Sequence, residues 1–491
     1  MVKKKSYLWL GLLIVSFLTF IVWYRVLGQA LMVEGPIYLA EPYVTQIFKG
    51  SLGSILSRYD LEVVLFFRVF GNLAKDNMKF YFSFLLLGIT LVNFGVFVAV
   101  KEVTKSFTAG IIAAALFISN FIGTFNMLGQ GAYQFFIQRV PGFAFALFSF
   151  VFVAKFFETK KNKYYWFSFA LYATGMFLAH YTFLFLPLLL YFIFAQTVFN
   201  DFRNVKKWFL AIVYIFPYIL WSYFLIRIQP AIGPSNSLFG PSNSPFLQFF
   251  ISRHLLIPEI LGRLTIITVP LGTIGFISRI FNGLSYAAVV SNLSYPIAVL
   301  YLVVTIFIFV KYKKMRVFIL SIFLAIFTSI MMALYLRIGI TVEFSSNRYL
   351  YLPSMFVSIF WGLPFYLLIR KGKIFKIIVP IFLASLFLYQ RSLIIKAFDV
   401  EQPASDTFLS SISFIKSNYK NFPDNSLIVL PVSEGSCQAR MFDRFYGERN
   451  IRYLGVNDDV KGEIKKSIAK KQKIFLLIYE SGKTFLQEKA I

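Results

Sequence analysis

The sequence is poor in the residues on which soluble and secreted folds depend. Its one cysteine, Cys437, has no partner for an internal disulfide, and one cysteine with two histidines excludes a structural zinc cluster. Charged residues are 14% of the 491-residue chain, against roughly 25% in a soluble globular protein. Acids are the scarcer sign, with 22 Asp and Glu against 49 Lys and Arg, a formal net charge of +27. No Walker loop, dinucleotide fingerprint, HExxH motif or nucleophile elbow occurs. These shortages exclude a soluble enzyme and a disulfide-stapled module.

Apolar residues take the place of the missing charges. The chain is 58% hydrophobic, with 62 Phe and 28 Tyr, which is more apolar surface than a water-soluble fold can bury. A membrane-spanning helix needs about 20 mostly apolar residues, because lipid offers no partner to backbone N–H and C=O groups. The sequence predicts about eleven spans, near residues 7–27, 80–100, 106–126, 141–157, 164–179, 182–199, 208–227, 291–310, 316–336, 349–369 and 374–391.

The basic residues predict the orientation of these spans. With the N-terminus inside, six short inner segments carry about 20 Lys and Arg, as the positive-inside rule requires. The outer loops 28–79, 127–140, 228–290 and 337–348 are longer and poorer in Lys and Arg. The chain is therefore predicted to be a multi-pass plasma-membrane protein with a cytoplasmic N-terminus and an extracytoplasmic C-terminus. The +27 charge is a topology signal and does not indicate nucleic acid.

Two outer loops are long enough to build a site. Loop 28–79 contains two stretches, 43–56 and 61–73, that are typical of helices lying on the membrane surface. Loop 228–290 begins with the Pro- and Gly-rich stretch 230–245, a lid or linker candidate, and continues with an apolar stretch over 246–280 that we interpret as re-entrant or interfacial.

The C-terminal part has a different pattern. Helical periodicity over 405–419 and 459–471 alternates with strand-like runs over 426–432, 451–455 and 473–479, which predicts a small α/β module. Asn457, Asp458 and Asp459 are interpreted as a helix cap and not as metal ligands. The predicted fold is an all-α polytopic membrane domain over 1–395, followed by an extracytoplasmic α/β module over 396–491.

Five polar residues at the predicted outer face are the candidate site residues, because a polar group beside lipid is costly. Glu34, with Glu41 as second choice, has the carboxylate that a general base needs. Arg348 at the start of the tenth span, and Arg139 at the start of the fourth, suit bidentate phosphate binding. His180, between two spans, suits phosphate binding or proton transfer.

The layout resembles the glycosyltransferase C (GT-C) superfamily of membrane enzymes, which use polyprenyl-phosphate-linked sugars. The stretch Arg348-Tyr-Leu-Tyr-Leu-Pro-Ser354 looks like a motif of the transmembrane O-mannosyltransferase (TMTC-like) branch, and Leu178-Ala-His-Tyr-Thr182 is similar to a polar interruption between two mid-chain spans. The family usually has an acid, often an Asp-Asp pair, in the first outer loop. This chain has no adjacent pair there, and by resemblance Glu34 takes the catalytic role.

The resemblance implies an inverting sugar transfer from a polyprenyl phosphate to an extracytoplasmic glycan, lipid or protein, as part of cell-envelope glycosylation. A divalent metal is left open. Two alternatives remain. An O-antigen polymerase or ligase would use Arg253, His254, Arg263 and Arg279 of loop 228–290. A lipid or solute transporter would need charges or Gly/Pro breaks in paired spans and related halves, which the sequence does not show.

Overall fold

The computed structural model describes two compact units of the chain. The first comprises Met1–Tyr24, Leu87–Asn126 and Arg139–Ile395, and the second comprises Arg25–Leu86, Met127–Gln138 and Lys396–Ile491. The residues described are 2–30, 70–71, 73–120, 140–201, 209–228, 256–269, 271–280, 285–336, 350–431, 435–455, 459–480 and 482–488.

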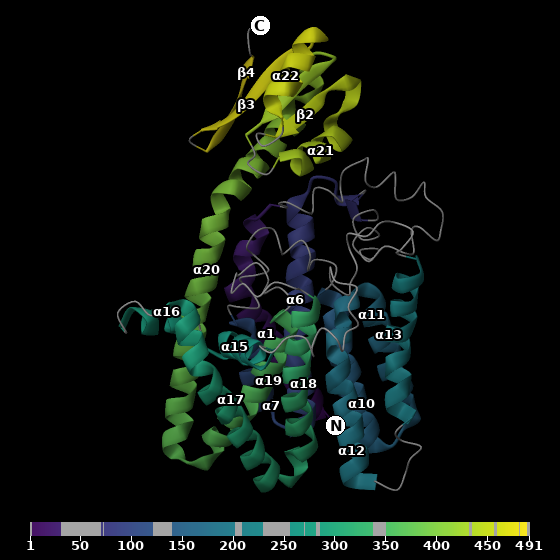
Figure 1. The fold of residues 1–491 in the computed structure, drawn as a ribbon, viewed down its shortest axis with the longest axis vertical. Coiled ribbons are helices and arrows are strands. Elements are labelled where there is room, and N and C mark those ends of the chain that lie inside the picture. The colour runs from purple at the N-terminus through teal and green to yellow at the C-terminus, as the bar shows by residue number, and fades with distance from the viewer. Residues whose placement is uncertain are drawn as a thin grey trace. The chain divides into compact units, whose positions relative to one another are not determined.

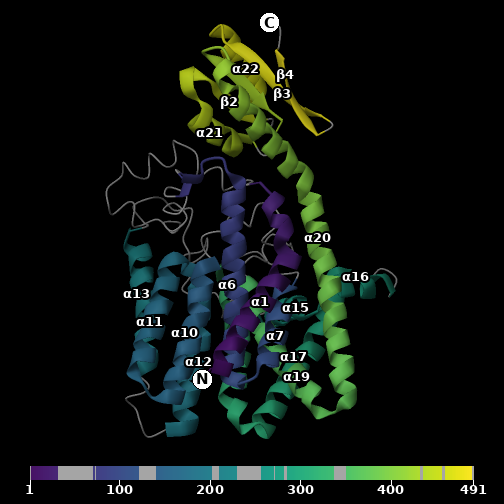
Figure 2. The same ribbon diagram turned by 180° about the vertical axis from the view of Figure 1, so that it is seen from behind.

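Helices make up the described part of the first unit (Figures 1 and 2). Two of them, α6 and α20, continue into the second unit. The main helices are α1 Val2–Trp23, α6 Met78–Thr104, α7 Phe107–Ile118, α10 Val140–Thr159, α11 Asn162–Leu178, α12 Leu186–Asp201, α13 Phe209–Ile228, α17 Tyr286–Lys311, α18 Arg316–Leu336, α19 Tyr351–Lys371 and α20 Lys373–Asn418. Between them lie the 3-10 helices η3 His180–Phe185 and η7 Lys313–Met315 and the short helices α15 Leu256–Thr268 and α16 Leu271–Ile280.

Within the described residues, seven helices are long and apolar enough to cross a membrane. Three shorter apolar helices accompany them, at Phe107–Ile118, Thr182–Thr197 and Phe209–Leu220. The protein is therefore an integral multi-pass membrane protein, mostly helical, with a small mixed sheet in its C-terminal part. This confirms the predicted fold class. Each of the eleven predicted spans overlaps a helix, and the orientation stays a prediction.

Some helix ends differ from the prediction. Helix α7 ends at Ile118 and not at 126, because Ser119 leaves the helical conformation and its Oγ donates to the carbonyl oxygen of Ala115 at 2.9 Å. The helix α20 continues through 391 to Asn418, where the sequence suggested a span and a separate helix over 405–419. Phe408, Ile412 and Ile415 continue its buried side at helical spacing.

Small residues set the closest helix contacts in the first unit. A methyl group added at Gly362 of α19 would lie 2.7 Å from Cβ of Ala113 on α7, and one added at Gly95 of α6 would lie 2.9 Å from the Leu147 side chain on α10. Helices in lipid associate by such close packing and by hydrogen bonds, because lipid tails are as apolar as leucine. One such bond joins Asn93 Nδ2 to Thr19 Oγ1 at 2.9 Å.

The stretch interpreted as re-entrant or interfacial contains α15 and α16. Their 13 and 10 residues are short of the roughly 20 that a span requires. Leu264 and Thr265 of α15 are fully buried, and the Thr265 hydroxyl donates to Ser294 Oγ of α17 at 3.4 Å. This burial favours the re-entrant interpretation for α15.

The second unit contains a four-stranded sheet in the order β2-β1-β3-β4. Strands β1 Ser426–Leu430, β2 Arg452–Gly455 and β3 Lys473–Glu480 are parallel, and β4 Lys483–Glu488 is antiparallel to β3. Leu427, Leu454 and Ile474 form a small core against Ile464 of α22 Val460–Ala469. Asp459 caps α22 by accepting from the Gly462 N–H at 3.0 Å, which confirms the predicted cap.

An acid of loop 28–79, the first of the predicted outer loops, stabilises this second unit. The Asp76 carboxylate accepts from the Tyr446 hydroxyl at 2.6 Å and forms an ion pair with Lys416 Nζ at 3.0 Å. Tyr446 ends α21 Gly435–Tyr446, a helix that the sequence did not predict. Burial and the hydrogen bond to Asp76 both raise the pKa of the Tyr446 phenol, so it stays a donor to the carboxylate. The role of Asp76 in the structure is thus to join segments of the second unit.

Candidate functional site

The five predicted site residues fall where the structure describes little or nothing. Glu34, Glu41, Arg139 and Arg348 lie outside the described residues. His180 is described through its backbone only, as the first residue of η3. Their roles stay predictions. The described residues beside three of them do, however, meet at one place in the first unit, which we call the helix-end cluster: Gly142, Phe143, Gly175, Ala179, Tyr351 and Phe117.

Two glycines bring the start of α10 against the end of α11. A methyl group at Gly142 would lie 2.7 Å from Cβ of Ala179 and 2.9 Å from the carbonyl oxygen of Gly175, so a side chain at this position would overlap its neighbours. The same Gly175 carbonyl accepts from the Ala179 N–H at 2.9 Å and from Thr182 Oγ1 at 3.0 Å. The backbone just before and after His180 is therefore tied to the first turn of α10, which directly follows Arg139.

The start of α19 joins the same cluster through an aromatic contact. The Tyr351 ring is buried and lies 5.8 Å from the Phe143 ring of α10 and 5.2 Å from the Phe117 ring of α7 (centroid distances). Five residues further along α19, Phe356 contacts Phe185 of η3 edge to face at a centroid distance of 5.0 Å. Since Tyr351 follows Arg348 by three residues in the sequence, the cluster links the chain neighbours of Arg139, His180 and Arg348.

A hydrogen-bond network adds α15 to these helices. Asn120, just past α7, donates from Nδ2 to the carbonyl oxygen of Ile267 at 3.4 Å. Thr268, which follows Ile267, forms a hydrogen bond through its hydroxyl with the Tyr301 hydroxyl at 2.9 Å. Trp361 Nε1 donates to the same Tyr301 hydroxyl at 2.8 Å. Sequence reasoning missed this network. Its only signal was single polar groups in otherwise apolar helices, and a sequence does not show which of them pair.

The residues of the polymerase or ligase alternative do not form a group that the structure describes. Arg253 and His254 lie outside the described residues. Arg263 is buried on α15, and Arg279 is exposed on α16. Within the described residues, no three His, Cys, Asp or Glu side chains gather as metal ligands. Glu34 and Glu41 lie outside that set.

Comparisons with known proteins add one partial likeness. No family model matches the chain, and no curated protein matches its sequence. Among solved structures, it is similar to ArnT from Cupriavidus metallidurans, whose crystal structure was determined with undecaprenyl phosphate bound. The match has 12% sequence identity, covers 97% of each chain and has a TM-score of 0.38.

Proposed function

We propose that this protein is a GT-C-type membrane glycosyltransferase, which transfers a sugar from a polyprenyl-phosphate donor to an extracytoplasmic acceptor. Three things support the proposal. The chain is a helical multi-pass membrane protein with a small mixed sheet in its C-terminal part. Its sequence carries the Arg348–Ser354 motif. The observation that carries most weight is the helix-end cluster, because three distant segments, each holding a proposed phosphate ligand, have neighbouring residues in mutual contact.

The proposed reaction is a single inverting displacement. The acceptor hydroxyl oxygen attacks the anomeric carbon, while the bond from that carbon to the phosphate oxygen breaks. The hydroxyl proton passes to the Glu34 carboxylate, with Glu41 as the alternative base, and the lipid phosphate leaves with the bonding electrons. Arg348, His180 and Arg139 stabilise the negative charge that grows on the phosphate. A single base suffices for one displacement, and the exposed apolar helix faces accommodate the polyprenyl tail.

The experiment measures release of free polyprenyl phosphate from radiolabelled undecaprenyl-phosphate mannose and undecaprenyl-phosphate glucose, by membranes that contain the full chain. Glu34→Gln should lower the rate by at least about 100-fold, the usual contribution of a general base. Glu480→Gln, an exposed carboxylate at the end of β3, is the matched control and should leave the rate unchanged. An unchanged rate in Glu34→Gln would show that the base is wrongly assigned.

The same membranes separate the alternatives. If alanine variants of Arg253, His254, Arg263 and Arg279 abolish the activity while Glu34→Gln keeps it, the polymerase or ligase alternative is correct. Uptake of a labelled lipid or solute that persists both in Glu34→Gln and in the four alanine variants would identify a transporter.

A further inference from the structure

Two turns at one end of the first unit are strongly basic and contain no acid. The turn from α17 to α18 and the turn from α19 to α20 lie at the lower end of that unit in Figure 1. Their basic residues are Lys311, Lys313, Lys314, Arg316, Arg370, Lys371, Lys373 and Lys376. All are exposed except Arg316, which is half-buried, and among the described residues none of the eight forms an ion pair.

The two turns converge on one aromatic ring. The Nζ atoms of Lys311 and Lys371 lie 5.3 and 5.2 Å from the centroid of the Phe307 ring. Helices α17 and α19 are packed together further along, where Tyr301 stacks on Phe360 at 4.6 Å. This packing holds two like charges at a single ring. A cation–π contact attracts an ammonium group without neutralising it, so both lysines stay positively charged beside the ring and can attract an anion.

The two arginines of these turns already have internal partners. Arg316 donates from Nε to the Phe309 carbonyl oxygen at 2.7 Å, where it caps the end of α17, and Arg370 donates to the Tyr366 hydroxyl at 3.2 Å. The lysines are different. Their ammonium groups are exposed, each has three donors, and flexible stems let them turn towards an anion.

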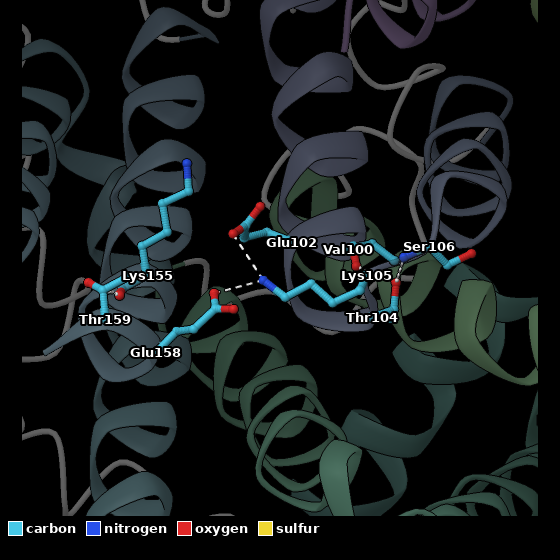
Figure 3. A network of polar contacts seen from close by, with 8 residues as sticks. All are labelled: Val100, Glu102, Thr104, Lys105, Ser106, Lys155, Glu158 and Thr159. Carbon is cyan, nitrogen blue, oxygen red and sulfur yellow. Dashed lines mark hydrogen bonds and ion pairs between the residues drawn. The ribbon is translucent and has the colours of Figure 1, made fainter. Parts of the chain in front are cut away.

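Another lysine turn in the same unit shows the opposite arrangement. Lys105, between α6 and α7, contacts Glu158 of α10 at 2.7 Å and Glu102 at 3.1 Å (Figure 3). Burial lowers the pKa of Lys105, but its hydrogen bonds to Glu158 and Glu102 outweigh that and leave the pKa above its ordinary value. At Lys105 the protein supplies its own anions, whereas at Lys311 and Lys371 it supplies none within the described residues.

The helices beside the basic turns present apolar surface. Ile306 and Val310 of α17, and Ile374, Ile377 and Ile378 of α20, are each more than half exposed. With 21 residues and a rise of about 1.5 Å per residue, α19 matches the roughly 30 Å hydrocarbon thickness of a bilayer, so its Arg370 and Lys371 end lies at the headgroup level. The setting combines apolar helix faces with unpaired cations directly beside them.

We propose that the Lys311 and Lys371 turns form a binding site for an anionic phospholipid. Its phosphate lies between the two ammonium groups beside Phe307, and its acyl chains lie on the exposed apolar faces of α17 and α20. On the predicted orientation, this lipid belongs to the inner leaflet. The proposal does not depend on the proposed glycosyltransferase activity, because none of its residues belongs to the helix-end cluster.

The test is native mass spectrometry of the purified full chain, titrated with tetraoleoyl cardiolipin, dioleoyl phosphatidylglycerol or dioleoyl phosphatidylcholine. We expect the wild type to retain one anionic lipid at concentrations where phosphatidylcholine is lost. The double variant K311Q/K371Q should bind that lipid at least about tenfold more weakly, since each lysine near an anionic lipid headgroup contributes to the binding free energy. K311R/K371R keeps the charges and should keep the binding.

Three controls make the outcome decisive. K155Q/K163Q changes Lys155 of α10 and Lys163 of α11, which lie over two different rings, Phe152 and Tyr164, and it should bind like the wild type. Excess inorganic phosphate should not displace the lipid, since a lipid site also needs the acyl chains. The thermal unfolding midpoint shows whether K311Q/K371Q is folded. Equal binding of cardiolipin and phosphatidylcholine, or wild-type binding by a folded K311Q/K371Q, would overturn the proposal. Glu34→Gln should leave lipid binding intact.

Discussion

The two ends of helix α19 differ in how they contact their surroundings: one end is buried in aromatic packing and the other carries exposed cations. At its start, Tyr351 is buried between aromatic rings of α7 and α10, and glycine contacts nearby bring backbones together. At its other end, Arg370 and Lys371 are exposed, and Lys371 contacts a ring that it shares with Lys311. The first end is built from rigid contacts that position helices. The second end is built from flexible cations whose described surroundings contain no counter-ion.

Because of this difference, we expect mutations at the two ends to have different effects on stability and binding. Changes at the Tyr351 end should affect stability and, through it, the alignment of any site formed there. Changes at the Lys371 end should leave stability nearly unchanged and alter only what binds there, because exposed charges contribute little to folding.

The largest expected effect concerns which side of the membrane each loop faces, because an introduced cysteine either reacts with an impermeant reagent in intact cells or does not. In a Cys437→Ser background, Lys313→Cys should react with a membrane-impermeant maleimide only after the cells are opened. Ser235→Cys, in the predicted outer loop 228–290, should react in intact cells. Labelling of both from outside would contradict the predicted orientation and move the proposed lipid site to the outer leaflet.

Tyr351→Ala should lower the stability of the first unit by about 3 kcal/mol, the range for removal of a large buried aromatic side chain. The matched control is Tyr366→Ala on the same helix, near the basic end, where the expected loss is below about 1 kcal/mol. Thermal unfolding of the purified protein in detergent measures both. Equal losses would show that the two ends of α19 do not differ in packing.

Gly142→Val should cost about 1–3 kcal/mol, because the new side chain overlaps Ala179 and the Gly175 carbonyl. Gly262→Ala is the control, since its added methyl would lie 3.7 Å from Val290, an ordinary contact. The same unfolding measurement applies. On the proposed function, Gly142→Val should also slow release of polyprenyl phosphate, because His180 and Arg139 flank the displaced backbone.

Glu158→Gln should have the smallest effect, a few tenths of a kcal/mol up to about 1, because both partners are about half exposed. The pKa of Lys105 in the folded protein is raised above its ordinary value of 10.5, so the contribution is present below about pH 10.5 and is lost as the pH rises through the folded value. The wild type and the variant should therefore converge in stability at alkaline pH. A difference that persists there would assign the effect to packing and not to charge.

Much of the fold was predictable because its signals are local. Lipid forces each spanning segment to satisfy its own backbone, so an apolar run of span length predicts a helix, and each of the eleven runs overlaps one. Asp459 was predictable as a cap for the same reason, since a cap depends on a few adjacent residues. Helix α21 and strand β4 were missed. Helix α21 is largely polar, with Ala439, Phe442 and Tyr446 as its buried side, and β4 is an edge strand with exposed charges at both ends.

The candidate site was predictable only as a set of residue types. Glu34, Glu41, Arg139, His180 and Arg348 follow from the cost of polar groups beside lipid and from the GT-C resemblance, and their roles stay predictions. Nothing in the sequence shows that Gly142 meets Ala179, or that Tyr351 meets Phe117. Lipid tails are as apolar as the helices, so the hydrophobic effect does not favour one helix pair over another. The shapes of the helix surfaces therefore decide which helices pack together.

The sequence by itself determined that the chain crosses a membrane many times and that a small sheet follows, and it predicts which side its lysines favour. These properties depend on composition and on patterns shorter than about one span. Only the tertiary structure decided which helix ends are in contact and, among the residues that the structure describes, which lysines have acidic partners and which do not. Lys105 and Lys371 look alike in the sequence. One contacts Glu158 and the other shares Phe307 with a second lysine, because packing of distant helices places those neighbours there.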